Sequence, residues 1–246
     1  MNMRRQSPNP KPNEFCEQSK GRYMSSYILR LYEDRLPASH APVFLPAAKR
    51  AVFVRDGSVT IETSDGCQHL ASHTGWVGSG ETAFIPASDE TTIWRWELVS
   101  APAESRGELR SSPLCVSALK LEKEIELDSN YSWLMRCDSV GFPPGGVALT
   151  HMHQGPGIRC VLKGNITIEA EGVVNHHGPG EAWFERGTAP VLAPTTEETD
   201  TVFIRCFILP RACKGRSSIR YVKPEDAALP KVQTYHVYAE QFIELP

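Results

Sequence analysis

The sequence lacks the features by which several protein classes are recognised. No apolar run approaches the roughly 18 residues that a membrane-spanning helix needs. Neither sign of charge dominates: the formal net charge of the 246 residues is −3, which gives no electrostatic basis for binding nucleic acid or an acidic membrane. Residues 1–22 carry charge but no apolar segment, so we expect no secretory signal there.

Motifs of several enzyme classes are also absent from the sequence. There is no GxGxxG or other phosphate-cradling loop, and no serine stands in a Gly-x-Ser-x-Gly context. The seven cysteines are odd in number and lack CxxC spacing, which favours reduced thiols and a cytoplasmic location over a disulfide framework. We expect Cys160 and Cys206 to act as small apolar strand residues.

Short β-rich runs make up most of the chain after its first 25 residues. A composition of 41% hydrophobic and 22% charged residues is typical of a soluble globular protein. Helical periodicity is scarce, and Gly, Pro, Asp and Asn separate the runs, which is typical of an all-β sandwich or barrel. The expected strands are 51–57, 59–63, 81–85 and 91–99 in the first half, and 159–164, 166–170, 181–185 and 201–209 in the second.

The order of these runs recurs, which indicates a duplicated domain rather than a short-period repeat. An offset of about a hundred residues relates the first hairpin to the second and 81–85 to 181–185. It also relates the strand of Trp94 and Trp96 to 201–209. Both indoles lie on one face of their strand, so that face is either core or a contact between the repeats.

The duplication divides the chain into three parts. Residues 1–25, rich in Pro, Asn, Ser and charge, are expected to form a mobile tail. The N-terminal repeat spans 26–112 and the C-terminal repeat spans 113–246, with a polar linker over 102–113.

Two histidines one residue apart, His151 and His153, are the most informative chemical feature. Side chains alternate faces along an extended strand, so both imidazoles lie on the same side. Two imidazoles on the inward face of a barrel can begin a metal site. Two alone rarely hold a divalent ion tightly, so a third protein ligand is needed.

The segment around these histidines resembles the first motif of the cupin superfamily. That motif is a Gly, five residues, His-x-His, three or four residues, Glu, six residues and Gly. The register is kept by Gly145, His151, His153 and Gly164, whereas Gly157 stands at the Glu position. The local text His-Met-His-Gln-Gly-Pro-Gly is similar to a cupin subgroup that reads His-x-His-Pro-Gly-Pro-Glu.

The second cupin motif and the first repeat match less completely. Gly180 fits the second motif, but its Pro, Gly, His and Asn positions hold Arg186, Thr188, Val191 and Thr195. In the first repeat the frame is kept by Gly57, Gly80 and Pro86, while the ligand positions hold Phe44, Pro46, Arg50 and Thr91. The resemblance covers residues 26–210 and implies a bicupin, two tandem jelly-roll barrels in one chain.

The resemblance implies a metal site in the C-terminal repeat and a scaffold role for the N-terminal one. In cupins that bind metal, His, His, Glu and His hold Fe, Mn, Ni or Zn and leave positions open for substrate. Glu185 is the leading candidate for the third ligand here, because it ends an inward-running strand beside the second motif. Gln154 and His40 are weaker options. Alternatively, the metal is lost and the histidines are leftover polar residues lining a cleft.

Arg159, Arg205 and Gln154 are candidates for binding a substrate. Arg159 lies two positions after Gly157 on the same strand, so it shares the inward face of that residue. A buried guanidinium needs an anionic partner, so Arg159 either pairs with Glu185 structurally or clamps an anionic substrate. Arg205 has the same two possibilities.

These observations favour a metal-dependent bicupin enzyme that acts on a small organic anion by dioxygenase, decarboxylase, lyase or isomerase chemistry. His151, His153 and Glu185 would hold the ion, and Glu185 and Arg159 are the predicted catalytic residues. A competing hypothesis is a non-catalytic bicupin that binds a metabolite or has a structural role. A third uses either histidine as a general base without metal. A homodimer paired through sheet edges is a further expectation.

Overall fold

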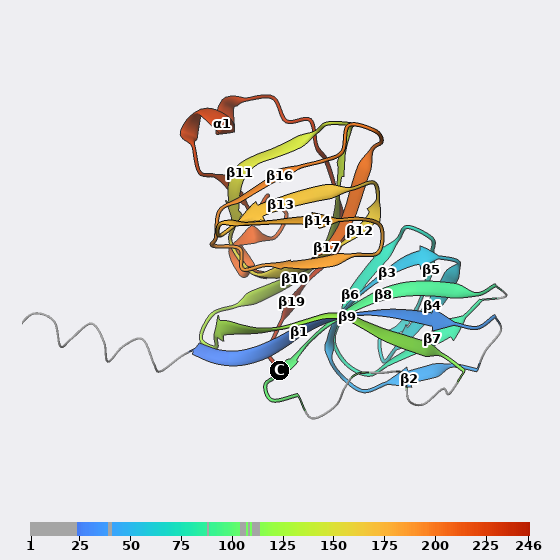
Figure 1. The fold of residues 1–246 in the computed structure, drawn as a ribbon. Coiled ribbons are helices and arrows are strands. Elements are labelled where there is room, and N and C mark those ends of the chain that lie inside the picture. The colour runs from blue at the N-terminus through green and yellow to red at the C-terminus, as the bar shows by residue number, and fades with distance from the viewer. Residues whose placement is uncertain (1–23, 39–40, 88, 104–106, 108, 110–113) are drawn as a thin grey trace, which may run out of the picture.

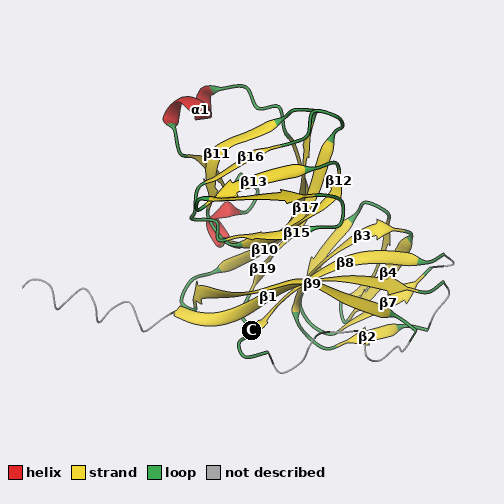
Figure 2. Ribbon diagram, viewed as in Figure 1, coloured by secondary structure: helices red, strands yellow, loops and turns green. Residues whose placement is uncertain are grey.

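The computed structural model describes residues 24–38, 41–87, 89–103, 107, 109 and 114–246. Strands dominate this part of the chain, with one 3-10 turn, η1 (Arg211–Cys213), and one helix, α1 (Pro224–Ala228), among the described residues (Figure 2). Neither segment has the length and apolar character needed to cross a membrane. The all-β prediction is confirmed. The predicted tail 1–25 and His40 lie outside the described residues, except that Met24 and Ser25 begin the first strand.

The first half of the chain folds into an antiparallel two-sheet barrel, here called the N-terminal barrel. Its strands are β1 (Met24–Leu36), β2 (Val43–Leu45), β3 (Lys49–Asp56), β4 (Ser58–Thr63), β5 (Gly66–Ala71), β6 (Gly75–Gly78), β7 (Thr82–Pro86), β8 (Thr91–Ser100) and β9 (Val116–Asp128). One sheet has the order β6-β3-β8-β1-β9 and the other the order β2-β7-β4-β5. The predicted strands of the first repeat are thus present.

The second half forms an equivalent C-terminal barrel. Its strands are β10 (Trp133–Phe142), β11 (Val147–His153), β12 (Gly157–Lys163), β13 (Ile166–Ala170), β14 (Val173–His177), β15 (Ala182–Glu185), β16 (Val191–Pro194), β17 (Thr201–Pro210), β18 (Ile219–Tyr221) and β19 (Thr234–Ile243). One sheet has the order β15-β12-β17-β10-β19 and the other the order β14-β13-β16-β11-β18. Figure 1 shows the two barrels as separate lobes, with β1, β9, β10 and β19 where they meet.

The segment that joins the repeats packs on the N-terminal barrel. Strand β9 pairs with β1 along most of its length, although it follows the predicted boundary at 112. Part of the predicted linker 102–113 lies outside the described residues. Of the described part, Leu109 is buried in the N-terminal core and the carbonyl group of Gly107 accepts a hydrogen bond from Arg95. The chain therefore continues through the first lobe up to Asp128.

Strand pairing corrects one equivalence drawn from the sequence. Strand β15 pairs with β12 just as β6 pairs with β3, so β15 corresponds to β6. The run 81–85 lies in β7, which pairs with β4 and corresponds to β16 instead. The prediction that 181–185 repeats 81–85 is therefore wrong. Two short strands can have similar alternating patterns of apolar and polar residues and still pair with different neighbouring strands.

The two sheets that meet between the barrels, β6-β3-β8-β1-β9 and β15-β12-β17-β10-β19, carry buried residues on both faces. Along β12, Ile158 and Cys160 point into an apolar core shared by the two barrels, while Arg159 and Val161 point into the C-terminal barrel. Cys206 joins the shared core, so the prediction for the two cysteines is confirmed. Trp94 and Trp96 lie in the same core, so their face is the contact between the repeats, one of the two expected positions. Each buried apolar side chain of this size stabilises the fold by about 1.5–3 kcal/mol.

Candidate metal centre

Strand β11 carries the two histidines into the C-terminal barrel. His151 is 5% exposed and His153 is 6% exposed, and their ring centroids lie 4.9 Å apart. The prediction that both rings share one face of an extended strand is confirmed. Strand β11 itself is held between β16 and β18, with His151 opposite Val191 on one side and Tyr221 on the other.

Both rings are held by contacts at Nδ1, and Nε2 of His153 faces Glu185. The Nδ1 atom of His151 lies 2.7 Å from the carbonyl oxygen of Leu149, to which it donates, and Nδ1 of His153 lies 3.1 Å from Ser218 Oγ. Burial lowers the pKa of both histidines, and the charges of Arg205 and Arg159 lower the pKa of His153 further. A neutral imidazole oriented through its other nitrogen is the form that binds metal.

Glu185 reaches the histidines from β15, which pairs with β12, the strand that begins at Gly157. It stands directly opposite Gly157, the residue at the motif's Glu position. A Cβ atom at Gly157 would lie 2.5 Å from the carbonyl oxygen of Cys206 and 2.8 Å from Phe207 Cδ1, so no side chain fits there. The carboxylate therefore comes from the neighbouring strand, at the same level of the barrel.

His151, His153 and Glu185 offer donor atoms that all lie within 4.8 Å of one another. His153 Nε2 is 4.0 Å from Glu185 Oε2. That oxygen is buried and accepts no hydrogen bond of good geometry, although it forms an ion pair with Arg159 Nη2 at 2.7 Å. The other oxygen, Oε1, accepts a hydrogen bond of 2.8 Å from Trp183 Nε1. Two neutral imidazoles and a carboxylate oxygen suit Fe, Mn, Ni or Zn. The residues therefore fit a divalent first-row ion.

Arg159 forms an ion pair with Glu185 from within the barrel wall. Its Nη2 atom lies 2.7 Å from Glu185 Oε2, and its guanidinium group lies 4.6 Å from the centre of the Phe207 ring. Burial lowers the pKa of Arg159 to about 10, so the group stays charged at neutral pH. Of the two roles expected for Arg159, the pairing with Glu185 is present. Arg159 is not among the residues that line the pocket beside the site.

The cavity beside the site has a volume of about 90 Å³ and opens to solvent. One end is polar and includes the two histidines, Glu185 and Arg205. The remaining wall is mostly apolar, and a few polar groups come from the segment after β17. The other lining residues are Val140, Phe142, Ala148, Ile166, Ile168, Trp183, Ala193, Phe203, Ser217, Ile219, Gln233 and Tyr235. Gln154 is not among them; its amide oxygen accepts a hydrogen bond of 3.2 Å from Arg220.

Arg205 lies in the pocket wall on β17 and is 8% exposed. Its Nε atom donates to Asp138, a fully buried carboxylate that also accepts a hydrogen bond of 3.0 Å from the hydroxyl of Tyr235. Neither Nη atom of Arg205 has a hydrogen-bond partner among the described residues. Arg205 is thus both anchored and able to donate to a ligand.

Sequence reasoning missed three residues that shape the site: Asp138, Ser218 and Tyr235. A signal existed for Asp138, because a charge inside the apolar run 133–142 needs a buried partner. No motif marks the other two. They come from the segment after β17, which folds back to pair β18 with β11 and β19 with β10.

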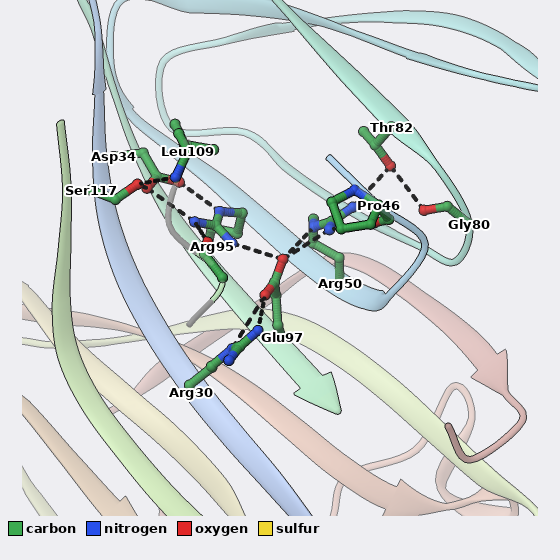
Figure 3. Close-up of polar contacts among 11 residues, drawn as sticks. Arg30, Asp34, Pro46, Arg50, Gly80, Thr82, Arg95, Glu97, Leu109 and Ser117 are labelled. Carbon is green, nitrogen blue, oxygen red and sulfur yellow. Dashed lines mark hydrogen bonds and ion pairs between the residues drawn. The ribbon is translucent and has the colours of Figure 1, made fainter. Parts of the chain in front are cut away.

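The N-terminal barrel holds a cluster of ion pairs at the corresponding place. Cross-strand pairs make Arg50 equivalent to Gly157 and Gly78 equivalent to Glu185. The guanidinium groups of Arg30, Arg50 and Arg95 converge on Glu97, at 3.0, 2.8 and 2.7 Å (Figure 3). Among the described residues, the histidine–glutamate group of the C-terminal barrel is the one cluster suited to a metal.

Comparisons with known proteins identify the fold. No family model and no curated protein matches the sequence. AerE from Microcystis aeruginosa has a similar structure, with a TM-score of 0.54 and 12% identity over 77% of this chain and 94% of that chain. A point mutant of Bacillus subtilis oxalate decarboxylase gives a TM-score of 0.53 and 11% identity over 85% and 74%. A cupin 2 conserved barrel domain protein from Leptotrichia buccalis gives 0.43 and 14% over 75% and 84%. At these identities the likeness to AerE and to oxalate decarboxylase shows a shared fold alone.

Proposed function

We propose that the protein is a metal-dependent bicupin enzyme that acts on a small organic anion, with its site in the C-terminal barrel. The observation that carries the proposal is the group of two neutral imidazoles and one carboxylate, whose donor atoms lie within 4.8 Å of one another beside a pocket. Three protein ligands leave coordination positions open for a substrate. The N-terminal barrel serves as a degenerate repeat that supports the site.

His151, His153 and Glu185 would hold the ion, which when bound supplies a Lewis acid that polarises a substrate oxygen. Ser218 and the Leu149 carbonyl group orient the two rings. Arg205 would bind the anionic group of the substrate through its Nη atoms, because its Nε atom is already held by Asp138. Dioxygenase, decarboxylase, lyase and isomerase chemistry all use such an arrangement of ion and anion.

Arg159 tunes Glu185 in this proposal rather than touching the substrate. The guanidinium group lies 2.7 Å from the oxygen that faces His153, so it holds the carboxylate in place. The same ion pair supports the second candidate, a non-catalytic protein that binds a metabolite. In that case Glu185 is satisfied by Arg159 alone, and the histidines contact the ligand without metal.

Metal content separates the two candidates. The protein is produced in cells supplied with iron, manganese, nickel and zinc, and its metal content is measured by elemental analysis. The matched variants are His151→Ala and, as a control, His69→Ala, which removes an exposed histidine of β5. We expect near one equivalent of metal in the wild type and the control, and loss in His151→Ala. Metal-free wild-type protein that also takes up no added ion would contradict the enzyme proposal.

A further inference from the structure

We infer that the pocket is built for a monocarboxylate with an apolar, preferably aromatic, body. This inference rests on the proposed function in that it names the substrate class of the same site. Its physical basis is the lining of the pocket, which combines the histidine–glutamate group and Arg205 with a mostly apolar wall.

The apolar wall is part of the core of the C-terminal barrel. Val140, Phe142, Ile166, Ile168 and Phe203 line the pocket and belong to one buried cluster. A ligand body in contact with this wall is stabilised by about 25 cal/mol for each Å² of apolar surface removed from water. A small, fully polar anion such as oxalate gains nothing from it.

Three aromatic rings shape one side of the wall. The centroids of Trp183 and Phe203 lie 5.1 Å apart in an edge-to-face arrangement, and those of Phe142 and Phe203 lie 6.2 Å apart. Such rings favour a further ring packed against them at similar distances. This geometry is the reason for preferring an aromatic body to a flexible chain.

The charged end admits one carboxylate. Among the described residues that line the pocket, Arg205 alone carries a permanent positive charge, and no lysine is present. Its two Nη atoms suit the two oxygens of a single carboxylate. A second carboxylate on the ligand would meet no second permanent cation among the described lining residues, and a buried charge without a counter-charge is costly.

The test measures binding to metal-free protein by titration calorimetry, with the full chain treated with a chelator. The probes are phenylacetate, acetate, oxalate and the neutral analogue phenylacetamide. We expect phenylacetate to bind at least about tenfold more tightly than each of the other three, because only it combines a carboxylate with an apolar body. Equal affinity for acetate or oxalate, or no binding of phenylacetate, would overturn the inference.

Two pairs of variants connect the preference to the pocket. Ala193→Leu fills the apolar wall, while Ala170→Leu makes the same change at a partly buried position outside it. We expect Ala193→Leu alone to weaken phenylacetate binding about tenfold. Arg205→Gln would leave Asp138 buried without its cation, so Arg205→Gln/Asp138→Asn accompanies it. Both are expected to lose the preference for phenylacetate over phenylacetamide, and a retained preference in the double variant would overturn the role of Arg205.

This experiment fails separately from the proposed function. Tight phenylacetate binding by protein that takes up no metal would contradict the enzyme proposal and leave the ligand class intact. Metal uptake without any preference among the probes would do the reverse.

Discussion

At the scale of single residues, the site depends on a carboxylate that comes from β15 rather than from β12. Glu185 on β15 stands opposite Gly157, the residue of β12 at the position where the cupin motif has its Glu. The alternation of a strand was enough to predict that His151 and His153 share a face. Glu185 was predicted as a ligand from its place at a strand end. Its position opposite Gly157 could not be predicted, because cross-strand register depends on the whole sheet. The pairing of Arg205 with Asp138 could not be predicted for the same reason.

The Glu185–Arg159 pair gives a first prediction. Glu185→Gln in metal-free protein leaves the buried guanidinium group without its anion, which costs about 3–5 kcal/mol of unfolding free energy. The double variant Glu185→Gln/Arg159→Gln removes both charges and is expected to recover most of that loss. Urea unfolding of the wild type, the two single variants Glu185→Gln and Arg159→Gln, and the double variant completes a double-mutant cycle. Additive losses would show that the two groups do not interact.

Gly157 gives a second prediction. Gly157→Ala places a Cβ atom 2.5 Å from the Cys206 carbonyl oxygen, so it is expected to destabilise the protein by about 1–3 kcal/mol. Gly178→Ala is the control, because its Cβ atom would meet a side-chain atom of Asn165 at 3.1 Å. Thermal unfolding measures both. An unchanged melting temperature for Gly157→Ala would mean that the cupin motif's glutamate had room at this position.

At the scale of elements, the two repeats use the same strands for different chemistry. Most strands were predictable from alternation and turn residues, but the match of 181–185 with 81–85 was not correct. Pairing, which the sequence does not encode locally, makes β6 the counterpart of β15. On these counterparts Gly78 replaces Glu185, and on β3 Arg50 replaces Gly157. The N-terminal interior is consequently filled by ion pairs.

The carboxylate of Glu97 predicts how the N-terminal barrel responds to acid. Burial alone would raise the pKa of Glu97, but Arg95, Arg50 and Arg30 outweigh it and lower the pKa to about 2. Between the ordinary pKa of a glutamate and this value, the unfolded chain binds a proton that the folded chain does not. Stability from Glu97 is therefore complete above about pH 4.5 and is lost as the pH falls toward 2.

The measurement is urea unfolding between about pH 4.5 and pH 3. We expect the unfolding free energy of the wild type to fall by up to about 2 kcal/mol more than that of Glu97→Gln over this interval. Glu97→Gln starts from a lower stability, so the slope with pH is the informative quantity. Equal slopes would show that the three arginines do not lower the pKa of Glu97 in the folded protein.

At the scale of the whole molecule, the two barrels are one folding unit because they share an apolar core. That core includes Trp94 and Trp96 from one barrel and Ile158 and Cys206 from the other. The sequence predicts that the two tryptophans lie either in a core or at a contact between the repeats. In the structure the contact between the repeats is itself an apolar core, so both descriptions apply. The C-terminal segment, which closes the pocket with Tyr235, carries no motif and was not predicted.

Separation of the barrels gives a fourth prediction. A fragment of residues 129–246 keeps β10 to β19 but exposes the apolar face that contacts the first barrel. We expect this fragment to bind a hydrophobic dye and to aggregate, because large exposed apolar patches associate. Light scattering and dye fluorescence measure both. A monomeric fragment that unfolds cooperatively with the stability of the full chain would show that the shared core is dispensable.

The central claim is that His151, His153 and Glu185 hold one divalent ion. X-ray absorption spectroscopy of the metal-loaded protein tests it most directly, because it reports the atoms around the ion. We predict two imidazole nitrogens and at least one oxygen in the nearest shell, with one imidazole lost in His153→Ala. A nearest shell without imidazole nitrogens, or one unchanged in that variant, would contradict the account.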